Sequence, residues 1–202
     1  MYTRRYNDIF PLVCMDETSK QQIMEVRPPR TVEPGRSRRY DAEYKRNGVS
    51  NLFMFFAPLQ GWRHVKVTNH RTKIDWAFAM RELVDEHFSC AKRITLVMDN
   101  LNTHCPSSLY EAFEPEEAKR ILSRLELHYT PKHGSWLNMA EIELSILGRQ
   151  CLSRRIADQE TLRHEVSEWQ RTRNSKALKI DWRFTTSDAR IKLKKLYPSF
   201  QH

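Results

Sequence analysis

Glycine is scarce in this sequence, and no glycine-rich phosphate-binding loop is present. Only five glycines occur among 202 residues, and they form neither a GxGxxG nor a Walker-type pattern. Because such loops hold nucleotide phosphates on their backbone N–H groups, their absence argues against a nucleotide-dependent enzyme. Long apolar runs are missing as well. None approaches the roughly 18 residues that a membrane-spanning helix needs, and no signal peptide is recognisable, so we expect no membrane partner.

Cysteine is also rare. The four cysteines, Cys14, Cys90, Cys105 and Cys151, form no CxxC pair, and their spacing suits neither a zinc site nor a disulfide framework. Free cysteines are typical of proteins in a reducing compartment. The sequence therefore predicts a cytoplasmic protein.

Positive charge, in contrast, is abundant. Lysine and arginine number 34 against 25 aspartates and glutamates, which gives a formal net charge of +9. Such an excess favours a polyanionic partner, most often nucleic acid. A basic face that contacts only solvent is the alternative, and charge by itself does not decide between them.

The excess is concentrated in residues 27–48. This segment holds seven basic residues against three acidic ones, together with three prolines and two glycines. We expect a long basic loop inserted into the domain, and loops of this length inside a compact domain are usually functional or disordered. The interpretation we favour is a contact with DNA or with a second subunit, with Arg36, Arg38 and Arg39 as contact residues.

The pattern of apolar residues predicts an α/β fold, a mixed sheet flanked by helices, in a single domain 1–202. Strands are expected at residues 10–16, 21–27, 51–57, 62–68, 94–99 and 125–130. Helices are expected at residues 72–88, 106–113, 115–124, 138–152, 158–172 and 187–196. In the first of these helices, Ile74, Phe78, Leu83 and Phe88 are expected to face the core.

Two aspartates follow buried strands of similar design. Asp16 ends the apolar run 12–15, and Asp99 ends the apolar run 94–98. If the two strands are parallel neighbours, the carboxylates come close together, at the carboxyl ends where sites of such sheets gather. A single aspartate after a strand often only starts a turn. Two at matching positions repel each other unless a cation compensates, and carboxylate oxygens are ligands for hard divalent cations.

The third acidic candidate is Glu141, near the start of the expected helix 138–152. Asn138 and Glu141 also fit a helix capping box, which is the structural alternative. Glu143 is the rival ligand, but residues two apart on a helix point about 200° apart and cannot share one site. Glu141 falls beside the small residues Ser145 and Gly148, which leave room for metal and phosphate, whereas Glu143 is expected on the solvent side. We therefore prefer Glu141.

Polar residues around these acids complete the predicted site. Lys132, His133 and Trp136 precede the helix of Glu141 and suit phosphate contact and base stacking, although Trp136 docked in the core is an equal alternative. Asn100, Asn102 and His104 follow Asp99 and are expected to orient a phosphate or a water. The predicted DNA contacts are Arg36, Arg38, Arg39, Lys132, His133, Trp136 and Arg149. The predicted supporting residues are Glu17, Asn100, Asn102, His104 and Asn138.

Residues 96–104 and 128–141 resemble the second and third catalytic blocks of mariner-like DDE transposases, in their bacterial insertion-sequence branch. Residues 15–17 resemble the first block, and residues 181–186 are also similar to that branch. The resemblance extends over nearly the whole chain. The two long blocks are specific, whereas the first is short.

The resemblance implies a ribonuclease H-like core in which Asp16, Asp99 and Glu141 hold Mg²⁺ or Mn²⁺, with two ions expected. It implies nicking of DNA at transposon ends, followed by joining of the freed 3′-hydroxyls to target DNA. The implied partners are transposon-end and target DNA and a second copy of the chain, in a bacterial cytoplasm at the nucleoid. Such proteins usually carry helix-turn-helix segments before the core. Asp16 lies so near Met1 that we expect this region to be absent or supplied by a separate polypeptide.

Two other functions stay open at this point. The chain could be a non-catalytic DNA-binding or regulatory fragment of a truncated or frame-split transposase, which would bind DNA without cutting it. It could also be another ribonuclease H-like nuclease, such as a junction resolvase.

Overall fold

The chain is built around one five-stranded sheet in a computed structural model that describes residues 1–27, 35, 43–132 and 134–192. The strands are β1 (Leu12–Glu25), β2 (Tyr44–Ala57), β3 (Trp62–Thr68), β4 (Ile94–Met98) and β5 (Leu125–Tyr129). Their order is β3-β2-β1-β4-β5. Strands β1, β2 and β3 pair antiparallel, whereas β4 pairs in parallel with both β1 and β5. The predicted mixed sheet is therefore confirmed, including the parallel pairing of the two strands that precede the aspartates.

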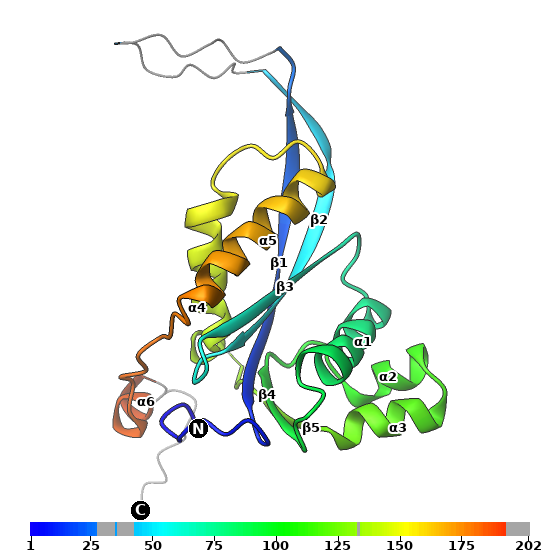
Figure 1. The fold of residues 1–202 in the computed structure, drawn as a ribbon, viewed down its shortest axis with the longest axis vertical. Coiled ribbons are helices and arrows are strands. Elements are labelled where there is room, and N and C mark those ends of the chain that lie inside the picture. Colours follow the sequence, from blue (N-terminus) through cyan, green and yellow to red (C-terminus); the bar gives the residue numbers. More distant parts are fainter. Residues whose placement is uncertain (28–34, 36–42, 133, 193–202) are drawn as a thin grey trace, which may run out of the picture.

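Helices cover both faces of the sheet (Figure 1). They are α1 (Lys73–Glu82) with the π-helical turn η1 (Leu83–His87), α2 (Pro106–Ala112), α3 (Pro115–Ser123), the short 3₁₀ turn η2 (Ser135–Leu137), α4 (Met139–Leu147) with the π-helical turn η3 (Gly148–Leu152), α5 (Gln159–Ser175) and α6 (Thr186–Lys192). One hydrophobic core lies between the sheet and α1 to α3, and a second lies between the sheet and α4 and α5. None of the described helices combines the length and the apolarity that crossing a bilayer requires.

Strand β1 occupies the centre of the sheet and is buried on both faces up to Met15. Alternate residues enter different cores: Val13 and Met15 face α1, whereas Leu12 and Cys14 face α4 and α5. A strand covered on both sides needs a continuous apolar run rather than an alternating one. The run ends at Asp16, which is the point where β1 leaves the fully buried region.

The outer parts of β1 and β2 form a long two-stranded arm, residues 19–25 and 44–51, that projects beyond the other strands (Figure 1). The expected break after residue 16 is wrong, because β1 continues to Glu25. The expected loop 27–48 is too long at its C-terminal end, because β2 already begins at Tyr44. The ladder between them consists of backbone hydrogen bonds, which need no apolar side-chain pattern. Residues 28–34 and 36–42, with Arg36, Arg38 and Arg39, lie outside the described residues.

The prediction for the core-facing side of helix 72–88 is right for Leu83 and Phe88, which are buried, and wrong for Ile74 and Phe78. Trp76 and Met80 are fully buried, whereas Ile74 and Phe78 are 40% and 39% exposed. The Phe78 ring instead packs edge-on against Phe113 after α2, with centroids 5.1 Å apart. Large apolar residues on both sides of a short helix leave its orientation to the neighbours that cover it, here the sheet and α2.

Candidate active site

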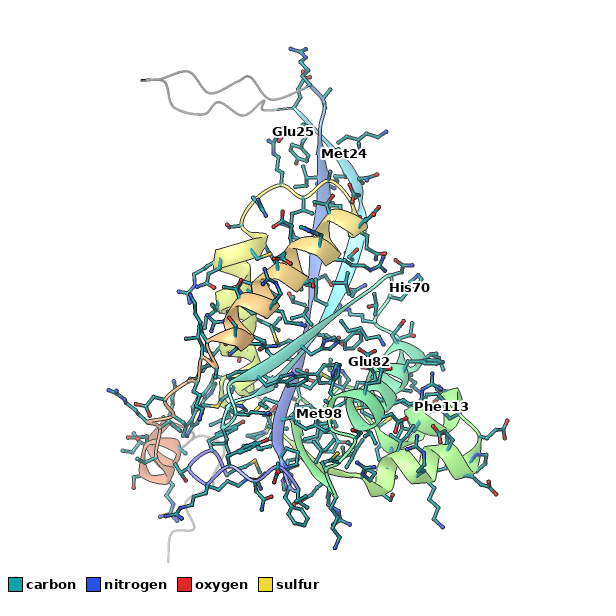
Figure 2. The ribbon with its side chains drawn as sticks, viewed as in Figure 1. Met24, Glu25, His70, Glu82, Met98 and Phe113 are labelled. Atoms are coloured by element: carbon teal, nitrogen blue, oxygen red, sulfur yellow. The ribbon has the colours of Figure 1, made fainter. Side chains whose placement is uncertain are left out.

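The register of two parallel strands places Asp16 beside Asp99. Cys14 of β1 pairs with Val97 of β4. Asp16 comes two residues after Cys14, and Asp99 comes two residues after Val97. Because side chains alternate along a strand, both aspartates share the sheet face of Cys14 and Val97, which is the face covered by α4. Figure 2 labels Met98, the last residue of β4, immediately before Asp99. The expected neighbourhood of the two carboxylates follows from this pairing.

Asn138 fixes the helix that carries Glu141 to the strand that carries Asp16. The Asn138 side chain is 1% exposed. Its oxygen accepts a hydrogen bond from the N–H of Ala140 at 3.1 Å, and its amide nitrogen donates to the carbonyl of Met15 at 2.7 Å. It therefore caps α4 and holds the first turn of α4 against the backbone next to Asp16.

Glu141 is exposed in that first turn and takes no part in a capping box. The cap of α4 runs from Asn138 to Ala140, and within the described residues the Glu141 carboxylate has no hydrogen-bond partner. The structural alternative considered for Glu141 is therefore not the arrangement found. Its carboxylate is available to a ligand at the site.

The electrostatics of Asp16 show that the three carboxylates act on one another. Burial is the largest cause that raises the pKa of Asp16 to about 6; a hydrogen bond from the Glu17 N–H opposes the rise, and the nearby charges of Asp99, Glu141 and Glu17 add to it. That bond reaches Asp16 Oδ1 at 2.8 Å. Mutually repelling carboxylates at a partly open edge are a fitting donor set for a hard divalent cation.

The spacing of these carboxylates is wider than that of ligands to one ion. Across the described residues, the oxygens of Asp16, Asp99 and Glu141 do not all lie within 4.8 Å of one another. Two-metal sites hold ions about 3.5–4 Å apart and need ligands spread over a correspondingly larger space. The three carboxylates therefore do not form a compact single-ion cluster in this structure.

The His104 ring is buried behind Asp99 and contacts its carboxylate instead of facing solvent. It is 0% exposed, with Nδ1 2.6 Å from Asp99 Oδ1 and Nε2 3.4 Å from Glu17 Oε2. Burial opposes a charge on the ring, but the hydrogen bonds to Asp99 and Glu17 outweigh it and raise the pKa of His104 to about 9. The expected contact of His104 with phosphate or water is wrong, because the turn after Asp99 folds the ring inward against Trp76.

The structure brings only some of the other predicted residues to a surface beside the site. Trp136 is half-buried, with the Phe184 ring centroid 4.7 Å away and Lys192 Nζ 4.3 Å from its own centroid. Its ring therefore contacts the segment around α6 and belongs to neither hydrophobic core, so the alternative of Trp136 docked in the core is not the arrangement found. His133 lies outside the described residues. The exposed members of the predicted set are Asn100, Asn102, Lys132 and Arg149.

Glu143 is buried, which corrects the expectation that it faces solvent. Its side chain is 0% exposed and lies 2.8 Å from the Nε of Arg63 and 2.7 Å from the Nε of Arg173. Helix α5 packs over this side of α4 and supplies Arg173, an arrangement that the periodicity of α4 alone does not reveal. Glu143 thus joins α4, β3 and α5 and points away from the three carboxylates, as the helical phase requires.

Sequence reasoning missed several residues that hold the site in place. Tyr2 donates a hydrogen bond to the carbonyl of Leu137 at 2.8 Å and so braces the turn before α4. Arg63 and Arg173 complete the buried ion-pair network of Glu143. A signal for Arg63 was present, because it shares the strand face of Val65 and Val67, and an arginine on an apolar face needs a buried partner.

The sequence matches a known protein family. The family described as DDE superfamily endonuclease matches residues 11–163, a span that contains Asp16, Asp99 and Glu141. No curated protein matches the chain.

Solved structures of similar fold include the Mos1 mariner paired end complex with Mn, at 15% identity and a TM-score of 0.55. They also include the Mos1 transposase paired-end complex with left transposon end, at 14% identity and a TM-score of 0.56. The first alignment covers 83% of this chain and 51% of that chain, and the second covers 84% and 51%. This chain therefore spans about half the length of those transposase chains.

The similarity confirms the predicted ribonuclease H-like architecture, a mixed sheet with helices on both faces. The family match extends over most of the chain and includes Asp16, Asp99 and Glu141. The chain belongs to the DDE superfamily of endonucleases.

Proposed function

We propose that the chain is the catalytic domain of a DNA transposase, formed by residues 1–202, which holds two divalent cations with Asp16, Asp99 and Glu141. The observation that carries the proposal is the convergence of three carboxylates from β1, β4 and α4 on one edge of the sheet. The register of β1 and β4 and the Asn138–Met15 hydrogen bond produce that convergence. The Mos1 complex with Mn, a protein of similar fold, supports Mg²⁺ or Mn²⁺ as the ions.

In this function each side chain has a definite task. The bound cations would activate a water or a DNA 3′-hydroxyl and stabilise the leaving oxygen of the phosphodiester. His104 holds the Asp99 carboxylate in one orientation by its 2.6 Å contact. Asn138 keeps the first turn of α4, and with it Glu141, against β1. The exposed Lys132 and Arg149 offer positive charge to the DNA backbone.

The proposed partners follow from charge and from the Mos1 complexes. The net charge of +9 suits transposon-end and target DNA, and Mos1 forms a paired-end complex. A second copy of this chain would be needed to hold two ends. We place this assembly in a bacterial cytoplasm, on the nucleoid of an insertion-sequence host.

The proposal is tested by nicking of supercoiled plasmid in the presence of Mg²⁺ or Mn²⁺. We expect metal-dependent nicking by the wild-type chain and its loss in Asp99→Asn and Glu141→Gln. The matched control is Glu160→Gln, which removes another exposed glutamate from the first turn of a helix, α5. Nicking that persists in the site variants, or that fails equally in the control, contradicts the assignment.

A second assay separates transposase from the two alternative functions. Short DNA duplexes with a free transposon-end 3′-hydroxyl should be joined to target DNA by the wild-type chain. Cleavage of four-way junctions without joined products would indicate a resolvase. DNA binding without any metal-dependent nicking would indicate a non-catalytic fragment, an outcome that the half-length match to the Mos1 chains makes worth testing.

A further inference from the structure

A second group of metal-binding side chains lies away from the carboxylates of the proposed catalytic site. It consists of His64 on β3, Glu82 at the end of α1 and His87 in the π-helical turn η1. Over the described part of the chain, this is the one group of three or more such residues whose ligand atoms all lie within 4.8 Å of one another. Figure 2 shows Glu82 at the point where α1 approaches the sheet.

The distances within this group suit a tetrahedral ion. Nε2 of His64 lies 2.9 Å and Nε2 of His87 lies 3.5 Å from the same oxygen, Oε1 of Glu82. Ligands about 2.0–2.1 Å from a tetrahedral zinc are about 3.3 Å apart, so the His87 separation is close to the required value and the His64 separation is about 0.4 Å shorter. Two imidazoles and one carboxylate form a donor set that zinc accepts, with a fourth position left for water.

Apart from their contacts with Glu82, the two imidazole nitrogens have no polar partner among the described residues. Nε2 of His64 and Nε2 of His87 are buried, and neither has a hydrogen bond of good geometry within the described residues, although both lie near Oε1 of Glu82. Buried polar atoms without a partner are uncommon in native proteins and call for an explanation such as an ion. The site is still reachable, since the three side chains are 18%, 22% and 20% exposed for His64, His87 and Glu82.

The π-helical turn is what brings His87 over Glu82. Residues five apart on a regular α-helix point about 140° away from each other. Here the Phe88 N–H bonds the carbonyl of Leu83, an i→i+5 bond at 3.0 Å, which inserts the extra residue of a π turn. Such turns occur frequently at functional sites. Without it, His87 would point away from the Glu82 carboxylate.

Aromatic neighbours hold the imidazoles in position. Trp62 stacks on the His64 ring with centroids 6.3 Å apart, and Phe55 stacks on it at 6.4 Å. The same Trp62 ring lies 5.1 Å from His87. A pocket of about 210 Å³, lined by Trp62, His87 and Asp8 among others, opens beside them and gives solvent a route to the group.

We propose that His64, Glu82 and His87 form a structural site for Zn²⁺ or a similar late transition-metal ion, separate from the Mg²⁺ or Mn²⁺ site. The ion joins the edge strand β3 to the end of α1. Lys66 pairs with Oε2 of Glu82 and leaves Oε1 to the two imidazoles. The His64 and His87 contacts, with Lys66, also lower the pKa of Glu82, which keeps the carboxylate ionised and ready to bind.

The site is tested by titrating ZnCl₂ against a fluorescent zinc chelator in the Asp99→Asn background, which weakens metal binding at the catalytic carboxylates. We expect one tightly bound Zn²⁺ per chain. His87→Gln and Glu82→Gln should each weaken it by more than about 100-fold, since even residues behind metal ligands alter affinity by 10–100-fold. His164→Gln, at an exposed histidine of α5, is the matched control and should leave zinc affinity unchanged.

Two further measurements keep the test independent of any folding defect. Zn²⁺ should raise the unfolding temperature of the wild-type chain and of His164→Gln, but not that of His87→Gln, with apo proteins in EDTA as references. Co²⁺ bound to the wild-type chain should give the intense visible absorption of a four-coordinate ion. Zinc affinity within twofold of wild type in both His87→Gln and Glu82→Gln, or only octahedral Co²⁺ spectra, would overturn the proposal. Loss of plasmid nicking plays no part in this test, so its outcome is distinct from that of the proposed function.

Discussion

The ionised carboxylate of Asp16 lowers the stability of the folded protein when no cation is bound. Burial and the charges of Asp99, Glu141 and Glu17 raise its pKa to about 6 from 3.8. The folded chain therefore holds the Asp16 proton more tightly than the unfolded chain does. By linkage, stability is lost as the pH rises from about 4 to 6 and stays lower above that range.

Asp16→Asn should therefore stabilise the protein when divalent ions are absent. At pH 8 in EDTA we expect a gain of about 1–2 kcal/mol, a discounted value because Asp16 is only partly buried. The gain should be smaller at pH 4 and nearly vanish near pH 3, where the wild-type carboxyl is mostly protonated in both states. Urea unfolding of both proteins at pH 8 and near pH 3 measures it. An equal difference at both pH values would show that the charge of Asp16 is not the cause.

A second residue-level prediction concerns Asn138. Asn138→Ala removes a helix cap and leaves the buried carbonyl of Met15 without its hydrogen bond. We expect a loss of about 2–3 kcal/mol, because an unsatisfied buried group adds to the cost of the missing cap. Asp158→Ala, which removes only the cap of α5, should cost about 1 kcal/mol in the same denaturation experiment. Similar losses in the two variants would speak against a special role for the Met15 contact.

At the scale of elements, α4 separates two glutamates into different environments. Glu141 faces the site edge, whereas Glu143 lies between Arg63 of β3 and Arg173 of α5. The helical phase of the sequence predicts that they diverge, but it does not predict which face is covered. The covering helix α5 is distant in sequence, and its Arg173 turns an expected solvent face into a buried ion-pair network.

The two glutamates should respond differently to the same substitution. Glu143→Gln leaves Arg63 and Arg173 without their buried partner, and we expect a loss of about 3–5 kcal/mol in the free energy of unfolding. Glu141→Gln should change stability little and abolish nicking. Thermal and urea unfolding, measured beside the plasmid assay, distinguish the effects. A stable Glu143→Gln variant that fails to nick DNA would move the third ligand to Glu143.

At the scale of the whole molecule, the two-stranded arm of β1 and β2 is the feature most relevant to DNA binding. The arm of β1 and β2 extends away from the edge that carries the three carboxylates (Figure 1), and in the sequence Arg38 and Arg39 lie between its two strands, outside the described residues. Its strands pair over their full length although their side chains are largely exposed. A basic arm of this kind can contact DNA at a distance from the site.

Charge reversal in this segment should alter the salt dependence of DNA binding. For Arg38→Glu with Arg39→Glu, we expect the slope of log K against log salt to become shallower by roughly 2, if each arginine neutralises one phosphate. Fluorescence anisotropy with duplex DNA over a range of NaCl concentrations measures the slope. Reversal of Lys92 and Arg93, an exposed basic pair before β4, is the control. An unchanged slope in the Arg38 and Arg39 variant would mean that these arginines contact only solvent and not DNA.

The sequence by itself determined the approximate places of the strands, the excess of positive charge and the positions of Asp16, Asp99 and Glu141 along the chain. These depend on local patterns, because apolar runs, turn residues and helical phase act over a few neighbouring residues. Only the tertiary structure decided that Glu143 and His104 are buried, that Trp136 contacts the α6 segment, and that His64 and His87 meet at Glu82. The physical reason is that a pattern defines the faces of one element, whereas the partner that covers each face comes from distant parts of the chain.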